Sequence, residues 1–359
     1  MTPELAALVR EELAGLSKYE IPHPPAIRAK LDANESPWPL PPAVAADLSR
    51  HLAEVPLHRY PDGGAAGLRA VFARMLGRAP DSLVFGNGSD ELIALLVTAF
   101  ARPRAGQARA RIAYPWPSFV VYRIATLAQG CEPVEIPLRP DFEFDRDATD
   151  RALAEMRPNV LFLALPNNPT GTLWPRAELE RLLARHPDMI IVADEAYLAY
   201  SGQEHLDLQG GHANLVVLQT LSKIGMAALR VGILVAEPTL AREVDKIRPP
   251  YNLGALNQAA AAYLLERHRD VLAEQAARVV VERERLVAAL ARIPGLTVFP
   301  TRANLVLVRT EGATALWQRL AERGVLVRNF DRPGPLAGCL RITVGTPEEN
   351  DLLLSALLV

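Results

Sequence analysis

The sequence feature that most constrains the fold is a repeated alternation of short apolar runs with helix-length segments over residues 83–236. Runs such as VLFLAL (160–165) and MIIVA (189–193) are apolar along their whole length. Strands of a parallel sheet are buried on both faces, so they are continuously apolar, whereas a strand with one face in water alternates apolar and polar residues. The pattern therefore predicts an α/β fold, with a large domain whose mostly parallel sheet is covered by helices.

Chain length and proline placement divide the sequence further. At 359 residues the chain exceeds what one hydrophobic core usually organises, which favours a second domain. Prolines break up the region before about residue 42, and short apolar runs return after residue 292. We expect an N-terminal arm (1–40) that joins the small domain, a large domain (41–255), a linking helical region (256–291) and a small C-terminal α+β domain (292–359).

Composition narrows the class of partner. The formal charge is -2 and the sequence pI is near 6.4, so no basic field is available for nucleic acid or an anionic membrane. No apolar run reaches the ~18 residues that a bilayer crossing requires. Cys131 and Cys339 are far apart, and the histidines are scattered, so we expect no metal site and reduced thiols in a cytoplasmic enzyme. A small-molecule substrate is favoured.

Polar residues stand where the apolar runs end. PNNPTG (166–171) follows one run, Asp194 ends the next, and Ser222 with Lys223 follows VVLQT (216–220). Ligands of parallel α/β sheets bind at these strand ends. Taken singly, each has a structural reading as a rigid loop, a salt bridge or an ordinary lysine. Together with a GNGSD turn (86–90) at a helix start, they match the needs of pyridoxal 5'-phosphate (PLP). Lys223 offers an amine for the aldehyde, Asp194 a carboxylate for the ring nitrogen, and PNNPTG hydrogen-bond donors for the phenolic oxygen. The helix start offers N–H groups for the phosphate.

The motifs are similar to those of fold-type I PLP-dependent aminotransferases, and most resemble the histidinol-phosphate aminotransferases. The resemblance covers residues 19–350 through DANESP, RYPDG, GNGSDE, PSFVVY, PNNPTG, ADEAY, TLSKIGMAALRVG and LRITVGTPEEN. PNNPTG and the lysine-to-arginine segment mark the superfamily, and GNGSDE with LRITVGTPEEN marks the narrower group.

The resemblance implies a role for each matching residue toward PLP. Lys223 is the residue that bonds to the cofactor aldehyde and moves the substrate's Cα proton, and Asp194 holds the ring nitrogen protonated. The other implied cofactor contacts are Asn168 and Tyr197 at the phenolic oxygen, Phe119 on the ring, and Ser89, Asp90, Ser222 and Arg230 at the phosphate. Tyr60 reaches the phosphate from the neighbouring subunit of a homodimer. The segment from Lys223 to Arg230 is one residue shorter than in many relatives.

The resemblance also implies a substrate site formed by Arg341, Arg328, Tyr19, Asn34 and Tyr122. Two arginines suit a dianionic phosphate, and Arg341 also suits the carboxylate of glutamate. The implied reaction is transamination of L-histidinol phosphate with 2-oxoglutarate. An aromatic amino acid aminotransferase and a threonine-phosphate decarboxylase remain alternatives, because both share the cofactor residues. A PLP-binding transcription regulator is not expected, because the residues before the first motif leave no room for a DNA-binding domain.

Overall fold

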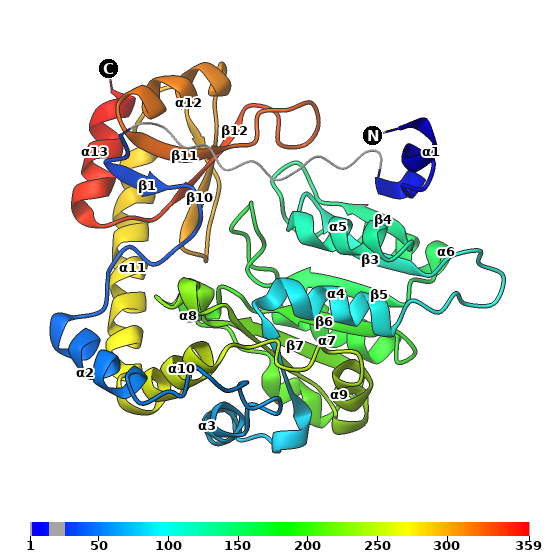
Figure 1. Ribbon diagram of the computed structural model, residues 1–359. Helices are drawn as coiled ribbons and strands as arrows, with labels where there is room; N and C mark the ends of the chain where they lie inside the picture. Colours follow the sequence, from blue (N-terminus) through cyan, green and yellow to red (C-terminus); the bar gives the residue numbers. More distant parts are fainter. Residues whose placement is uncertain (1, 14–25, 359) are drawn as a thin grey trace.

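The structure is a computed structural model that describes residues 2–13 and 26–358. Its larger sheet has the strand order β2-β8-β7-β6-β5-β3-β4 (Figure 1). The strands are β2 (Leu83–Asn87), β3 (Arg111–Trp116), β4 (Glu132–Pro137), β5 (Val160–Ala164), β6 (Ile190–Asp194), β7 (Leu215–Thr220) and β8 (Val231–Val235). Neighbouring strands are parallel except at β8, which runs antiparallel to β2 and β7. The mostly parallel sheet predicted from the apolar runs is confirmed.

The pleat of each strand sends alternate residues into two separate cores. In β5, Leu161 and Leu163 enter one core, while Val160 and Phe162 enter the other. The first core is covered by α2 (Pro42–Leu52), α3 (Ala66–Leu76), α6 (Arg146–Met156), α7 (Arg176–Arg185) and α10 (Ala255–Arg267), and the second by α4 (Ser89–Ala99), α5 (Val120–Ala128) and α9 (Pro238–Asp245). Because helices cover both faces, every residue of β5 is buried.

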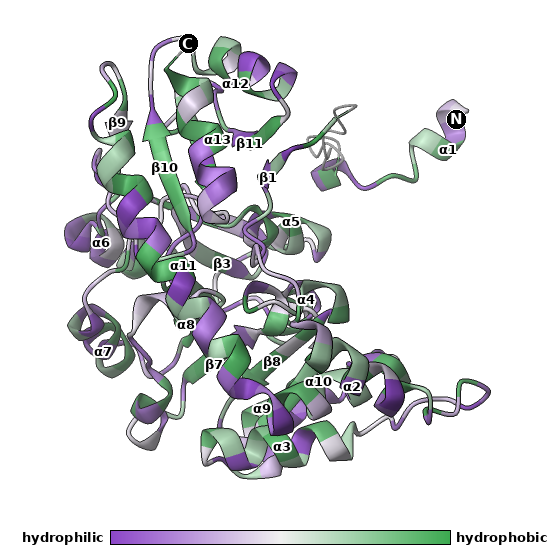
Figure 2. Ribbon diagram, turned by 90° about the vertical axis from the view of Figure 1, so that its left-hand side faces the viewer, coloured by the Kyte–Doolittle hydropathy of each residue, from purple (hydrophilic) through white to green (hydrophobic). Residues whose placement is uncertain are grey.

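A smaller sheet forms the second domain, with the order β1-β11-β12-β10-β9. Its strands are β1 (Ala29–Leu31), β9 (Thr297–Val298), β10 (Leu305–Arg309), β11 (Val325–Asn329) and β12 (Cys339–Thr343). β1 is parallel to β11, and the remaining pairs are antiparallel. Its core also holds side chains of α11 (Arg269–Leu290), α12 (Ala313–Glu322) and α13 (Pro347–Leu357). Hydrophobic residues dominate β10, whereas hydrophilic and hydrophobic residues alternate along α11 (Figure 2).

Two helices connect the domains. α10 and α11 meet at His268, whose φ of -136 and ψ of 25 lie outside the helical range. α10 contributes Leu264 to the large-domain core, and α11 contributes Leu286 to the small-domain core. Figure 1 shows α11 running from α10 up to the small domain.

The N-terminal residues contact both domains. β1 belongs to the small sheet, whereas Arg10 donates hydrogen bonds to the carbonyls of Leu127 (3.0 Å) and Ala128 (2.6 Å) at the end of α5. The last carbonyls of a helix have no partner within it, so a guanidinium there satisfies them. Tyr19 lies outside the described residues.

Two kinds of feature are missing from the described ranges. None of the helices in residues 2–13 and 26–358 combines the length and apolarity of a membrane span. In the same ranges, no three His, Cys, Asp or Glu side chains gather so as to hold a metal ion.

Candidate active site

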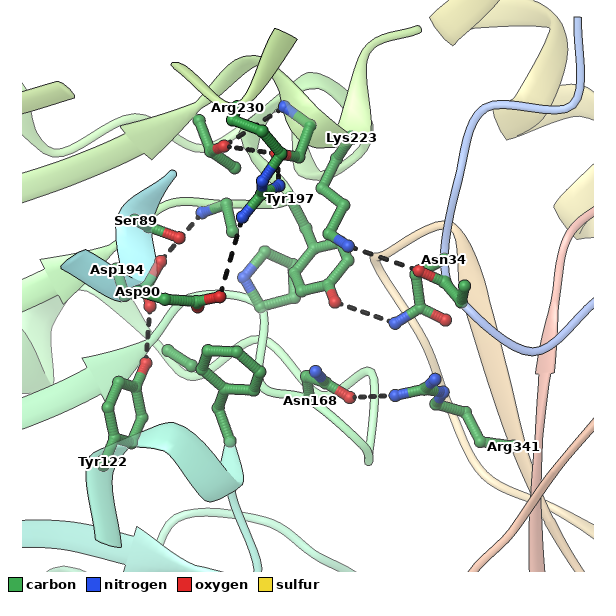
Figure 3. A pocket seen from close by; sticks show the side chains of 17 residues that line it. Asn34, Ser89, Asp90, Tyr122, Asn168, Asp194, Tyr197, Lys223, Arg230 and Arg341 are labelled. Carbon is green, nitrogen blue, oxygen red and sulfur yellow. Dashed lines mark hydrogen bonds and ion pairs between the residues drawn. The ribbon is translucent and has the colours of Figure 1, made fainter. Parts of the chain in front are cut away.

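A pocket opens at the carboxyl ends of the central strands of the large sheet and faces the small domain (Figure 3). Most of the predicted site residues line it together. They are Asn34, Ser89, Asp90, Phe119, Tyr122, Asn168, Asp194, Tyr197, Ser222, Lys223, Arg230 and Arg341. The parallel strand order brings these positions together, because each loop leaves the sheet at the same edge.

Lys223 lies in the 3-10 turn Leu221–Lys223, directly after β7. Thr220 starts this turn, because its hydroxyl accepts a 3.1 Å hydrogen bond from the Ser222 backbone N–H. The hydroxyl of Tyr200 donates to the Lys223 carbonyl, and Lys223 Nζ lies 3.4 Å from the Ala33 carbonyl. Burial lowers the pKa of Lys223 to about 8, and the charge of Arg341 acts in the same direction. The amine is therefore available as a nucleophile near neutral pH.

Asp194 ends β6 and is buried. Its Oδ2 accepts a 2.7 Å hydrogen bond from the Tyr122 hydroxyl, and its Oδ1 accepts one of 3.2 Å from the Ala196 N–H. Burial raises the pKa of Asp194 to about 6, against the effect of these donors. Among the described residues, no lysine or arginine forms an ion pair with Asp194. A buried carboxylate that faces a pocket without a cation partner suits a ligand with a protonated nitrogen.

Two hydrogen-bond donors stand beside the carboxylate. Asn168 Oδ1 accepts a 2.7 Å hydrogen bond from Arg341, so the side-chain group of Asn168 that remains for a ligand is its NH₂. Tyr197 Oη accepts a 2.8 Å hydrogen bond from Asn34 Nδ2. Burial raises the pKa of Tyr197 to about 12, so its phenol keeps its proton at neutral pH.

The far end of the pocket lies at the start of α4, a position that suits an anion. Ser89 and Asp90 form the first turn of this helix, and helix N-termini present unpaired N–H groups. Arg230 N donors reach this point: Nη1 donates to Ser222 Oγ at 3.2 Å, and Nη2 lies 3.8 Å from Asp90 Oδ2. Although the segment from Lys223 to Arg230 is one residue shorter than in many relatives, the Arg230 guanidinium still reaches the start of α4.

A glycine makes this approach possible. Gly88 precedes α4 with a φ of +76, and a Cβ built there would lie 2.5 Å from Arg230 Nη2. Any larger residue would displace the guanidinium, besides occupying a backbone region that L residues rarely adopt.

The aromatic residues of α5 frame the pocket. Phe119 caps the helix and meets Tyr122 edge-on, with ring centroids 5.7 Å apart and planes at 88°. Tyr122, predicted at the substrate site, lines the pocket; its ring is buried and stacks on Phe162, and its hydroxyl donates a hydrogen bond to Asp194.

The two arginines predicted to bind substrate lie on strands of the small sheet. Arg341 is buried on β12, and Arg328 on β11 lies directly opposite it in the register. Arg341 donates to Asn168 and, at 2.5 Å, to the Asp32 carbonyl. Arg328 does not line the pocket itself, but residues opposite each other on adjacent strands lie side by side. Tyr60 is 82% exposed and stacks on Tyr251, away from the pocket of its own chain.

The structure adds residues that sequence reasoning missed. Tyr200 anchors the Lys223 backbone, and nothing in the sequence distinguishes it from a core tyrosine. Thr343 contacts Asn34, and here a signal existed: in a strand, residues two apart share a face, so Thr343 lies on the same side of β12 as Arg341.

Comparison with known proteins agrees with this geometry. The model of the aminotransferase class I and II family matches residues 27–357. A histidinol-phosphate aminotransferase of Chromobacterium violaceum is 43% identical over 352 residues, which are 98% of this chain and 97% of that protein. A second, from Methylibium petroleiphilum, is 43% identical over 361 residues, with coverage of 99% and 95%.

Solved structures share the whole fold. The histidinol-phosphate aminotransferase of Sinorhizobium meliloti, in complex with pyridoxal-5'-phosphate, superposes with a TM-score of 0.82 at 26% identity, covering 96% of this chain and 98% of that one. The L-threonine-O-3-phosphate decarboxylase of Porphyromonas gingivalis superposes with a TM-score of 0.78 at 25% identity, covering 92% and 98%. From the family match and the full-length identity, the chain belongs to the class I and II aminotransferase family.

Proposed function

We propose that the protein is a PLP-dependent aminotransferase that transfers the amino group between L-histidinol phosphate and 2-oxoglutarate, giving imidazole acetol phosphate and glutamate in histidine biosynthesis. The observation that carries the proposal is the meeting of a low-pKa lysine, Lys223, with the buried carboxylate of Asp194 in one pocket. The relatives with 43% identity are histidinol-phosphate aminotransferases, which supports this substrate.

The residues present fit PLP at each of its functional groups. Lys223 would hold the aldehyde carbon, Asp194 the ring nitrogen, and Asn168 with Tyr197 the phenolic oxygen. Phe119 would cover the ring, and Ser89, Asp90, Ser222 and Arg230 would hold the phosphate. When bound, PLP supplies an aldehyde for amines and a ring that accepts the electron pair left at a substrate carbon.

The protein's own groups then act at defined atoms. Lys223 Nζ, with its pKa near 8, is the base that can remove the proton from substrate Cα and return it. With PLP bound, Asp194 would keep a proton on the ring nitrogen, because a buried carboxylate is stable only when a cation is paired with it. Tyr197 and Asn168 would each present a donor to the phenolic oxygen of PLP, and their contacts with Asn34 and Arg341 hold both side chains in place beforehand.

Arg341 and Arg328 support recognition of an anionic substrate. They occupy opposite positions on β12 and β11, and of the two, Arg341 lines the pocket. Two such groups match a phosphate dianion, and Arg341 alone matches the carboxylate of glutamate. The same Arg341 also orients Asn168, which couples substrate binding to the cofactor donors.

We also propose a homodimer in which Tyr60 serves the partner's site. Tyr60 and Tyr251 stack at 4.8 Å and are 82% and 48% exposed, and Leu57, three residues before Tyr60 in the sequence, is 73% exposed. A stacked pair of exposed aromatic rings favours coverage by another protein surface. Arg230 and Asp90 leave the phosphate end half open, where a second copy can add a residue. The free thiols of Cys131 and Cys339 support a cytoplasmic location.

A substrate panel tests the function. Purified protein with PLP and 2-oxoglutarate is offered L-histidinol phosphate, phenylalanine, tyrosine and threonine phosphate, and specificity constants are compared. We expect histidinol phosphate to have the highest value. A preference for phenylalanine, or release of CO2 from threonine phosphate, would overturn the proposed substrate.

A further inference from the structure

Asn34 occupies an unusual place beside the pocket. It follows β1 in the left-handed backbone region, with a φ of 55, and is 1% exposed. Asparagine tolerates this conformation better than most L residues do. The Asn34 carbonyl accepts a 3.0 Å hydrogen bond from the buried Asn304, which fixes the backbone.

The side chain of Asn34 joins two hydroxyl groups from different domains. Its Nδ2 lies 2.8 Å from Tyr197 Oη, at the large-domain wall of the pocket. Its Oδ1 lies 3.1 Å from Thr343 Oγ1, on β12 of the small domain. Tyr197 and Thr343 are 4% and 3% exposed, so water does not compete for these contacts.

The donor and acceptor in each of these hydrogen bonds can be assigned from the Asn34 backbone N–H, a group that can only donate. The backbone N–H of Asn34 donates to Thr343 Oγ1 at 2.9 Å. The Thr343 hydroxyl is thereby an acceptor toward the backbone, and its own hydrogen is directed to Asn34 Oδ1. With Oδ1 occupied, the amide presents Nδ2 to Tyr197, which must accept. The reverse amide orientation would leave the Thr343 hydrogen without an acceptor among the described residues, at a cost typical of a buried unpaired donor.

We propose that Thr343 and Asn34 are positioning residues that aim the hydroxyl hydrogen of Tyr197 into the pocket. The inference rests on the proposed function, since the group that would receive this hydrogen is the phenolic oxygen of PLP. A tyrosine hydroxyl has one hydrogen. Because Tyr197 accepts from Asn34, that hydrogen is not used on Asn34 and remains for the ligand.

Charge and burial agree with this role. Burial raises the pKa of Tyr197 to about 12, so the phenol has a proton to give, and the Asn34 donor opposes that rise only partly. The chain of contacts also crosses from the small domain to the large one. The orientation of the Tyr197 hydroxyl therefore depends on the contact between the small domain and the large domain.

The test is the variant Asn34→Asp, which is close in size and tolerates the same backbone region. The carboxylate introduced there cannot donate, so Tyr197 would donate to it and withdraw its hydrogen from the cofactor. The readout is the pH titration of the visible absorbance of the cofactor joined to Lys223. We expect the midpoint to rise by roughly 1 to 2 pH units, the effect of one lost hydrogen bond to a charged oxygen.

The double variant N34D/Y197F distinguishes an effect of N34D that acts through the Tyr197 hydroxyl from a direct effect of the new carboxylate charge on the titration midpoint. If Asn34 acts through Tyr197, Y197F alone raises the midpoint and N34D adds nothing to it. A shift from N34D that persists in full in the Y197F background would show a direct charge effect and overturn the proposal. An N34D midpoint equal to that of the wild type would overturn it as well.

A second pair of variants keeps the test informative if N34D does not fold. T343S retains the hydroxyl and should titrate like the wild type, whereas T343V removes it and should shift in the same direction as N34D. Equal midpoints for T343V and T343S would overturn the role of Thr343. A wild-type protein with no titrating band would instead refute the proposed function itself, and the inference with it.

Discussion

The hydroxyl of Tyr122 donates a 2.7 Å hydrogen bond to Oδ2 of Asp194. Because Tyr122 is held by Phe162 and Phe119, the donor cannot follow the carboxylate if it moves. The bond stabilises the ionised form of Asp194, which burial otherwise disfavours.

Tyr122→Phe should therefore weaken PLP binding at pH 7 by roughly tenfold to a hundredfold, the value of a hydrogen bond to a charged group. Titration of cofactor-free protein with PLP, followed by fluorescence, measures the dissociation constant. In the wild type, affinity should fall as the pH drops below about 6, where Asp194 takes up a proton. In Y122F this fall should begin at higher pH.

Tyr114→Phe is the matched control for that variant. Tyr114 is a neighbouring buried tyrosine whose hydroxyl also meets a carboxylate, Glu135 Oε1 at 3.3 Å, but outside the pocket. Its loss should leave the PLP dissociation constant unchanged. Equal weakening in both variants would mean that Tyr122 acts only through packing.

Asp194→Asn should make the cofactor-free protein more stable at alkaline pH. The pKa of Asp194 is raised from 3.8 to about 6, so the folded state binds the proton more tightly than the unfolded state. Stability therefore falls as pH rises from 4 through 6, by up to about 3 kcal/mol above pH 6. Thermal melting of the cofactor-free forms should show a higher midpoint for D194N at pH 8 and a much smaller difference near pH 4. With PLP present, the order at pH 8 should reverse.

The reactivity of Lys223 should follow its lowered pKa. Only the neutral amine attacks an aldehyde, so the rate at which cofactor-free protein forms its visible band with PLP should rise with pH through about 8 and then level off. An ordinary lysine would keep rising toward its usual value of about 10.4. Lys223→Ala should form no band and trap no cofactor on borohydride reduction.

Arg328→Ala should separate the two substrates. Loss of a charged hydrogen bond should raise the KM for L-histidinol phosphate by roughly tenfold or more while leaving that for glutamate little changed. Arg341→Ala should impair both, and should also lower kcat because Asn168 loses its partner. Steady-state kinetics with each substrate varied separately give the comparison. An equal effect of R328A on both substrates would argue against a phosphate pocket.

Mixing two inactive variants should restore activity if Tyr60 serves the partner's site. A hybrid of Lys223→Ala and Tyr60→Ala subunits contains one site with both residues intact, in the subunit that retains Lys223. With random pairing, reassociated mixtures should reach about a quarter of wild-type activity. Mixtures that stay as inactive as their components would exclude this arrangement.

The strands of the large sheet and the residues at their ends could be predicted from the sequence, because both depend on patterns within short segments. Apolar runs defined the strands, and the rule that parallel strands end at one edge brought Asp194, Asn168 and Lys223 together. The contacts that tune them join distant segments, such as Tyr122 with Asp194 and Asn34 with Thr343, 309 residues apart. Side-chain direction across such separations is set by packing of whole domains, which no local periodicity encodes.

β1 pairs in parallel with β11, and Ala29 lies opposite Val325, 325 − 29 = 296 residues later. During synthesis at roughly 5 to 20 residues per second, about 15 to 60 s separate the appearance of the two strands. The large sheet, by contrast, ends at Val235 and can assemble while β1 is still without its neighbour. The nascent chain therefore holds residues 29–31 without the strand they pair with for most of its time on the ribosome, so the small sheet can be completed only near the end of synthesis.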